Sequence, residues 1–337
     1  MVIGITPGAQ CMSRIIQGTL AARACCALMG LAGLLMLVSC GSSNIEVAPH
    51  LLPLQKDTMM LLGKKGMDAQ APIFIRIFKE ESELEIWKQR DDGRFYHFKT
   101  YPICNWSGDL GPKTRYGDRQ APEGFYRITR DQMNPDSKYH LAMNLGYPNT
   151  FDRALHRDGD FLMIHGKCKS AGCYAMTDPL IEEIYAIARE SFLGGNDSFQ
   201  VHAFPFRMTD ENMARFASHE AYPFWKTIKE AYDYFEQTRE LPAVAVCNRR
   251  YVVNVALRTG DLSRLDPEGP CPAFLKPPLS PFKPRPGEQF AEQRIVVPGQ
   301  KMRSLASVDE PGARSGLLST GSTGSGFLPN MSFAPGR

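Results

Sequence analysis

Residues 164–178 constrain the fold and chemistry of this chain more than any other stretch of its sequence. His165 lies eight residues before Cys173, and Gly172 directly precedes the cysteine. A cysteine is a strong nucleophile only as its thiolate, so it needs a neighbouring base or positive charge, and imidazole can be that base near neutral pH. Gly172 lets a substrate approach closely and leaves backbone N–H groups free to face an oxyanion. The segment therefore predicts a cysteine nucleophile activated by a histidine.

The flanks of this segment predict a strand-to-helix connection. Residues 160–164 read as a hydrophobic strand, and Asp178 followed by Pro179 is typical of a helix start. Cys173 would then lie a few residues from a helix N-terminus, where a thiolate is favoured.

The segment resembles the active-site motif of the L,D-transpeptidase catalytic domain (YkuD) family. That family reads His-Gly, a variable loop, then Ser-x-Gly-Cys, and its YafK-like branch has a short loop and continues Gly-Cys-Tyr-Ala-Met-Thr-Asp. In this chain the motif consists of His165-Gly166, Ser170, Gly172-Cys173 and residues 174–178. Other stretches similar to that branch are residues 113–114, 121–128, 133–135, 146–149 and 204–208. The resemblance extends from about residue 73 to residue 208, with weaker support to about residue 254.

One position departs from the wider family pattern. Many members carry an arginine two residues after the cysteine, where this chain has Ala175, a change that the YafK-like branch shares. The departure leaves open which cation, if any, binds the substrate carboxylate.

The predicted fold is mainly β with flanking helices, an α+β arrangement. Strands are predicted over residues 73–78, 84–88, 94–101, 124–129 and 139–145, and helices over 179–192, 209–217 and 223–235. Strands followed by helices are compatible with the β-sandwich that the resemblance implies.

Five segments are predicted along the chain. They are a lipoprotein signal peptide (1–39), a tether (40–72), the catalytic domain (73–208), a helical extension (209–260) and a Pro/Gly/Ser-rich disordered tail (261–337).

The resemblance also implies a reaction, which is acyl transfer on peptidoglycan stem peptides. Cys173 would attack a peptide carbonyl and form a thioester, while His165 takes the thiol proton and returns it to the leaving amine. The Gly166 carbonyl would fix the imidazole tautomer, and the N–H groups of Gly172 and Cys173 would stabilise the oxyanion. Neither a metal nor an organic cofactor is needed.

Three functional outcomes remain open at this point. An amine acceptor gives a crosslink, as in the wider family. Water gives hydrolysis, and YafK-like enzymes are associated with releasing an outer-membrane lipoprotein from peptidoglycan. The third possibility is a non-catalytic lipoprotein that binds wall peptides, which the intact His165 and Cys173 disfavour. A zinc site at His165, Cys168 and Cys173 is also disfavoured, because it offers only three ligands and no Cys-x2-Cys pair.

The N-terminus predicts export and lipid anchoring. Residues 24–38 form an apolar run preceded by Arg14 and Arg23, which is the plan of a secretory signal and is short for a membrane span. The run ends Leu37-Val38-Ser39-Cys40-Gly41, which resembles a bacterial lipobox with Cys40 as the acylated residue. A plain signal peptide or an uncleaved anchor is the alternative. Because the residue after Cys40 is not aspartate, the expected location is the periplasm, anchored to the outer membrane.

The cysteine count fits an oxidising compartment. Of nine cysteines, four lie at or before position 40 and Cys173 is the predicted nucleophile. The other four, Cys104, Cys168, Cys247 and Cys271, allow three pairings, of which Cys247 with Cys271 is the easier guess. The net charge of +3 includes the two leader arginines, and so small a charge implies no nucleic-acid partner.

Overall fold

The computed structural model describes residues 47–284 and 294–296. All of these except Val47 belong to one compact unit that begins at Ala48. The predicted signal peptide and the predicted lipidation site Cys40 lie outside the described residues. Within the described ranges, no helix has both the length and the apolar character needed to cross a membrane.

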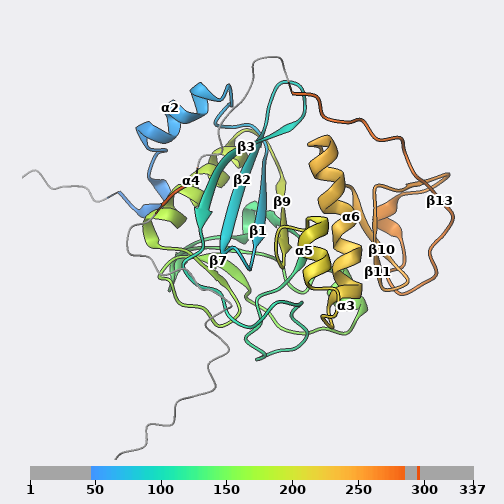
Figure 1. Ribbon diagram of the computed structural model, residues 1–337. Coiled ribbons are helices and arrows are strands. Elements are labelled where there is room, and N and C mark those ends of the chain that lie inside the picture. Colours follow the sequence, from blue (N-terminus) through green and yellow to red (C-terminus); the bar gives the residue numbers. More distant parts are fainter. Residues whose placement is uncertain (1–46, 285–293, 297–337) are drawn as a thin grey trace, which may run out of the picture. The chain divides into compact units, whose positions relative to one another are not determined.

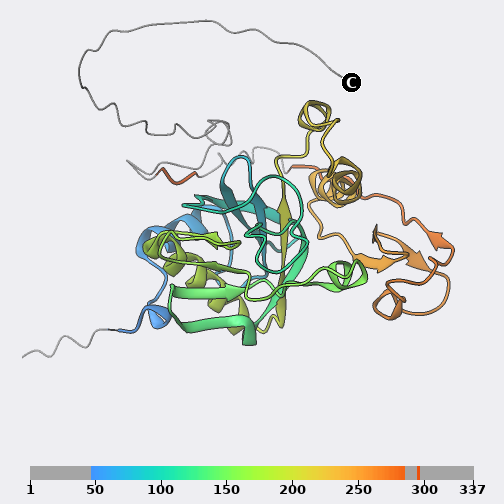
Figure 2. The same cartoon turned by 90° about the horizontal axis from the view of Figure 1, so that it is seen from below.

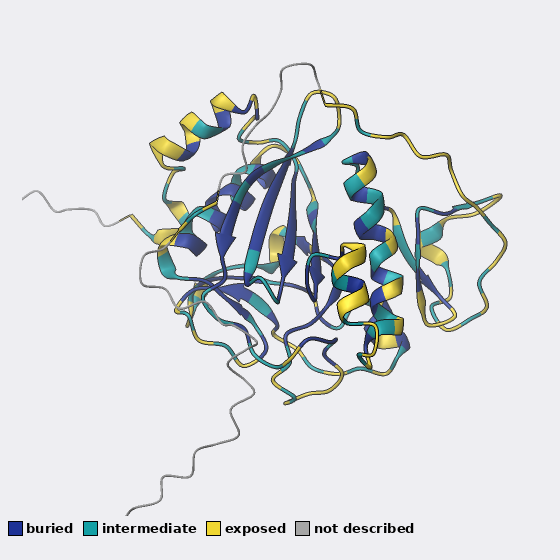
Figure 3. Ribbon diagram, in the orientation of Figure 1, coloured by how far each residue is buried: buried dark blue, intermediate teal, exposed yellow. Residues whose placement is uncertain are grey.

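A five-stranded sheet forms the centre of the unit (Figure 1). Its spatial order is β3 (Phe95–Pro102), β2 (Glu83–Gln89), β1 (Ile73–Phe78), β9 (Ser198–Phe204) and β4 (Gly124–Thr129). β1 and β9 run parallel, and the other neighbouring pairs are antiparallel. All six residues of β1 are buried, as Figure 3 shows, because both faces of this strand are covered.

A buried charge network lies within this sheet. Arg76 of β1 contacts Glu85 of β2 at 3.4 Å and Glu236 at 2.6 Å. Pairing is required here, because an unpaired buried charge is strongly destabilising.

A second, four-stranded sheet carries the predicted motif. Its order is β5 (Met133–Ser137), β6 (His140–Asn144), β7 (Met163–His165) and β8 (Tyr174–Ala175). β7 and β8 are parallel neighbours, and Ala175 of β8 also bridges to Asn105, which follows β3. Helix α4 (Asp178–Leu193) packs on β6 through an apolar face that includes Ile181, Ile184 and Ala188.

The remaining helices and strands are short, except for helix α6 in the second half of the chain. They are η1 (Pro49–Leu51), α2 (Lys56–Lys64), η2 (Arg130–Gln132), α3 (Thr150–Ala154), α5 (Asp210–Arg215), α6 (Tyr222–Thr238), β10 (Val244–Cys247), β11 (Arg250–Val253), β12 (Ala256–Leu257), η3 (Leu262–Arg264) and β13 (Phe274–Leu275). Helix α6 contacts strand β11 and lies near the β10–β11 hairpin (Figures 1 and 2).

The predicted fold class, mainly β with flanking helices, is confirmed. The helical extension predicted over 209–260 is helical only as far as Thr238. A hairpin follows, because β-branched and aromatic residues flank Asn248 and Arg249, which both have positive φ. Such a turn matches the twist of paired strands.

The predicted tail begins with packed residues rather than with a loose chain. Leu275 pairs with Ala256, Cys271 is bonded to Cys247, and the Phe282 amide donates to the Gln237 carbonyl. Most of the rest of the predicted tail, residues 285–293 and 297–337, lies outside the described residues.

Part of the predicted tether also packs on the domain. Residues 56–64 form α2, and the side chains of Leu62 and Met67 are 2% and 5% exposed within the hydrophobic core. Helix α2 buries few apolar residues, so the sequence of residues 56–64 does not by itself predict a helix.

We predict that α2 contributes to the stability of the domain. Leu62→Ala should lower the free energy of unfolding by about 2–5 kcal/mol, because it leaves a cavity in the core. Met60→Ala, at a position 65% exposed on the same helix, should change it by less than about 0.5 kcal/mol. Denaturant unfolding of both variants measures the difference, and equal values would mean that α2 is dispensable to the fold.

Candidate active site

The loop between β7 and β8 carries the predicted motif. His165 is the last residue of β7, and β8 begins directly after Cys173. Because β7 and β8 are parallel, residues 166–173 must bring the chain back along the sheet to start the next strand. The loop uses positive φ angles at Lys167, Cys168 and Gly172 to do so. The predicted nucleophile and the predicted base are thereby placed at two ends of one short loop.

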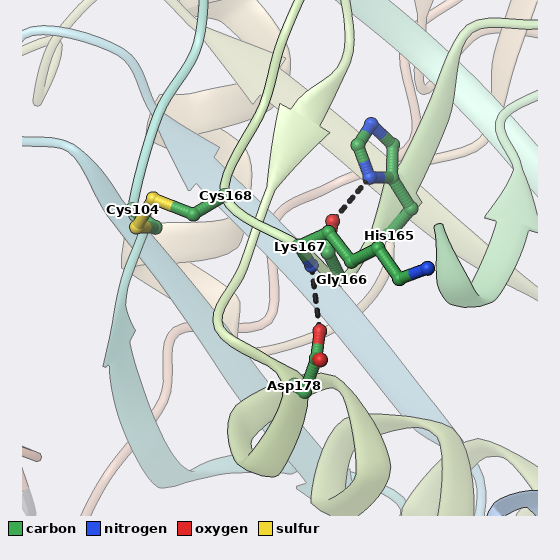
Figure 4. The surroundings of a disulfide bond; sticks show 6 residues. All are labelled: Cys104, His165, Gly166, Lys167, Cys168 and Asp178. Carbon is green, nitrogen blue, oxygen red and sulfur yellow. Dashed lines mark hydrogen bonds between the residues drawn. A yellow bond between two sulfur atoms is a disulfide. The ribbon is translucent and has the colours of Figure 1, made fainter. Parts of the chain in front are cut away.

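His165 is buried and held in one tautomer. Its Nδ1 lies 2.7 Å from the Gly166 carbonyl oxygen, which can only accept, so Nδ1 must donate (Figure 4). Nε2 is then the unprotonated nitrogen that can accept a proton. Burial lowers the pKa of His165, and the Gly166 carbonyl opposes this more weakly. The ring is therefore neutral near pH 7, as a general base requires.

Cys173 is a half-buried thiol. The Met163 amide donates to its Sγ at 3.4 Å, and Sγ lies 3.5 Å from the Phe161 carbonyl oxygen. Burial raises the pKa of the Cys173 thiol, while the Met163 amide and the Lys113 ammonium lower it to a smaller extent. The structure therefore gives a neutral resting thiol. It does not support the expectation that the nearby start of α4 favours a resting thiolate.

Ser170 and Gly172 shape the backbone beside the thiol. Ser170 Oγ donates to the Cys173 carbonyl at 2.7 Å and accepts the Gly172 N–H at 3.2 Å. Gly172 has φ of +123°, and a Cβ there would lie 3.1 Å from Leu162 Cδ1. The positive φ therefore favours glycine here, and the close approach of Leu162 adds to that preference.

Of the two backbone amides expected to face an oxyanion, that of Gly172 has a hydrogen-bond partner within the loop. Since Ser170 Oγ already accepts the Gly172 N–H, this amide does not face a substrate. The Cys173 N–H makes no hydrogen bond with any part of the chain that the structure describes, and it is the remaining candidate donor.

His165 and Cys173 line the same cavity, of about 430 Å³. Exposed aromatic side chains of Tyr139 and Phe161 form part of its wall. Two exposed lysines, Lys138 and Lys169, also line it, and in the described ranges no acidic side chain pairs with either. The cavity can thus hold an extended substrate with apolar and anionic parts.

Several of these residues were missed by the sequence reasoning. Phe161 and Met163 act partly through backbone atoms, and Lys138 reaches the cavity from the β5–β6 turn, so no local motif marks them. Lys113 lies in a stretch that resembles the family, but its charge effect on Cys173 depends on tertiary proximity. The Lys113 ammonium donates hydrogen bonds to the Arg115 carbonyl and the Asp118 carboxylate.

The cysteine pairings are now determined. Cys104 is bonded to Cys168 and Cys247 to Cys271, and among the described cysteines Cys173 is free. The disulfide removes Cys168 from the set of metal ligands. Across residues 47–284 and 294–296, no cluster of three potential metal ligands occurs.

The pKa directions give a test of this site that needs no substrate. Because burial raises the pKa of Cys173, its labelling rate with iodoacetamide should still be rising above pH ~8.5, the usual thiol pKa. Because burial lowers the pKa of His165, the imidazole should remain an effective base down to below pH ~6.5. Mass spectrometry of the Cys173 peptide gives the rates, with Cys173→Ser as the blank. A rate that has levelled off by pH 7 would instead indicate a resting thiolate–imidazolium pair.

Comparison with known proteins finds matches over this region. The family described as "L,D-transpeptidase catalytic domain" (YkuD) matches residues 74–194. The protein named "Putative L,D-transpeptidase YafK" of Escherichia coli K12 is 48% identical over 187 residues, covering 56% of this chain and 76% of that protein. Its counterpart from E. coli O157:H7 gives the same values. The solved structure of the helical cell shape determining protein Pgp2 from Campylobacter jejuni is 18% identical, has a TM-score of 0.33, and covers 54% of this chain and 68% of that one.

Proposed function

The chain belongs to the L,D-transpeptidase catalytic domain family, and from that membership we propose that it is a peptidoglycan-modifying acyltransferase with Cys173 as its nucleophile. The observation that carries this proposal is the buried His165, whose Nδ1 is bonded to Gly166 while the ring shares a cavity with the Cys173 thiol. Family membership and the similarity to YafK support a peptidoglycan-related function in general. The thioester mechanism at Cys173 is our proposal beyond that general function.

The first half-reaction follows from the two protonation states. The neutral imidazole accepts the thiol proton at Nε2 as Sγ attacks a peptide carbonyl carbon of a stem peptide. In this proposal the Cys173 N–H donates to the resulting oxyanion, and such a donor contributes about 3–4 kcal/mol to transition-state stabilisation. The imidazolium then returns the proton to the leaving amine, and an acyl thioester remains on Cys173.

The second half-reaction depends on which nucleophile reaches the thioester. An amine from another stem peptide gives a crosslink and regenerates the thiol. Water gives hydrolysis at the same carbonyl, which is the alternative outcome and would allow the release of a wall-linked protein. Both routes use His165 as the base for the incoming nucleophile, so the catalytic pair is common to them.

Incubation with purified muropeptides tests this proposal. Cys173→Ala should abolish all products, and His165→Gln should lower the rate by about 10²–10⁴-fold, because it removes the general base. Mass spectrometry separates crosslinked dimers from shortened monomers and so identifies the acceptor. If the wild-type protein binds muropeptides but releases no product, the wall-binding alternative replaces the catalytic one.

The lysines that line the cavity can bind negatively charged groups of a substrate. Stem peptides carry carboxylates, and Lys138 and Lys169 are the two ammonium groups among the lining residues. Lys113 is already engaged by Asp118, so it is less suited to this role. We therefore assign carboxylate recognition to Lys138 and Lys169, in place of the arginine absent at Ala175.

The double variant Lys138→Gln/Lys169→Gln should raise KM about tenfold with little change in kcat. The loss of two exposed ion pairs, each contributing about 0.7 kcal/mol to substrate binding, accounts for this rise in KM. Lys64→Gln, an exposed lysine on α2, is the matched control and should leave KM unchanged. An unchanged KM in the double variant would mean that another group binds the carboxylate.

A periplasmic location with lipid anchoring at Cys40 is part of the proposal, supported by the Leu37-Val38-Ser39-Cys40 run. Cys40→Ser should move the protein from the membrane fraction to the soluble periplasm, because the lipid chains provide the anchor. Fractionation followed by immunoblotting measures this. A processed variant that still pellets with membranes would exclude Cys40 as the anchor.

A further inference from the structure

Two of the attachments of the loop formed by residues 166–173 lie outside the pair His165 and Cys173 (Figure 4). One is the disulfide between Cys104 and Cys168, and the other is the carboxylate of Asp178. We propose that these two attachments are a positioning clamp: they hold the Gly166 carbonyl against Nδ1 of His165 and so keep Nε2 available as the base. The inference concerns the same site as the proposed function, but its test does not require a peptidoglycan substrate.

Asp178 holds the start of the loop. Its Oδ1 accepts the Lys167 N–H at 2.7 Å, which fixes the residue that follows Gly166. A Cβ added at Gly166 would lie 2.6 Å from the same oxygen, so the carboxylate packs directly against Gly166. Because Asp178 is the first residue of α4, this contact ties the loop to a helix of 16 residues.

The disulfide holds the next residue of the loop. Cys104 is itself placed by its amide, which donates to the Ala175 carbonyl of β8 at 2.9 Å. Cys168 is bonded to it across 64 residues of sequence, and the Cys168 amide donates to the Met176 carbonyl at 3.1 Å. The chain between Gly166 and Ser170 is thus fastened to β8 as well as to α4.

The backbone conformation explains why a clamp is needed. Lys167 and Cys168 are consecutive non-glycine residues with φ of +61° and +49°. Left-handed conformations are unfavourable for such residues and persist only where their surroundings enforce them. Without the clamp the turn can relax, and the Gly166 carbonyl then leaves Nδ1. The imidazole would no longer be held in the tautomer that the thiol needs.

The second disulfide offers a matched control. Cys247 and Cys271 close a loop between the β10–β11 hairpin and the segment before β13, and neither lines the cavity of Cys173. The chain entropy that a disulfide removes grows only with the logarithm of loop length. Loss of either disulfide should therefore lower the melting temperature, whereas only loss of the Cys104–Cys168 bond should alter the catalytic pair.

The experiment compares Cys104→Ser/Cys168→Ser with Cys247→Ser/Cys271→Ser in the full chain. Double variants avoid an unpaired partner thiol, and peptide mass spectrometry follows iodoacetamide labelling at Cys173 alone. At pH 7 and below both melting temperatures, we expect labelling to slow at least about tenfold in the first variant and to stay at the wild-type rate in the second. The ¹⁵N shifts of His165, assigned through His165→Gln, should show loss of the Nδ1–H tautomer in the first variant only.

Variants of Asp178 test the clamp with both disulfides intact. Asp178→Asn keeps an oxygen that can accept the Lys167 N–H, and Asp178→Ala removes it, although both lose the same charge at the start of α4. We expect near wild-type labelling for Asp178→Asn and slowed labelling for Asp178→Ala.

Two results would overturn the clamp. One is wild-type labelling in Cys104→Ser/Cys168→Ser, and the other is equal slowing in the two disulfide variants. If labelling follows the expected pattern while the wild type gives no product from muropeptides, the proposed function fails and the clamp stands.

Discussion

The hydrogen bond from Nδ1 of His165 to the Gly166 carbonyl is the interaction on which the site depends. It connects adjacent residues, so the backbone must turn sharply at the end of β7 to bring the carbonyl back to the ring. No side chain fits at Gly166, because a Cβ there would lie within about 3.1 Å of atoms of Asp178, Tyr139 and His140. The base of the proposed reaction is therefore oriented by backbone geometry, in the role that a third side chain has in other catalytic triads.

Strand pairing on both sides makes this geometry rigid. His165 lies opposite Ala142 in β6 and Ala175 in β8, and small residues at these positions leave room for the ring. Tyr174, directly after Cys173, is fully buried, and its hydroxyl donates to the Pro122 carbonyl at 2.6 Å. The Cys173 backbone is thus held by the core, while its thiol stays at the cavity.

Sequence reasoning predicted the parts of this structure that local patterns encode. The strands 73–78 and 124–129 agree with β1 and β4, and the order His165, Ser170, Gly172, Cys173 located the site. Strand β9 was missed, although Phe199, Val201 and Ala203 alternate with more polar neighbours. The guess that Cys247 pairs with Cys271 is confirmed, which leaves Cys104 to pair with Cys168. The lysines of the cavity could not be predicted, because only tertiary packing brings them together.

Burial shifts the pKa values of both groups of the proposed catalytic pair so that their uncharged forms are favoured. It raises the pKa of Cys173 and lowers the pKa of His165, so a resting thiolate–imidazolium pair is disfavoured. In the proposed reaction the charges appear only when a carbonyl carbon accepts electrons from Sγ and the Cys173 N–H meets the developing oxyanion. Reactivity is thereby coupled to the presence of substrate. In the proposed periplasmic location a neutral Cys173 would also be less susceptible to oxidation, since the thiolate is the reactive form.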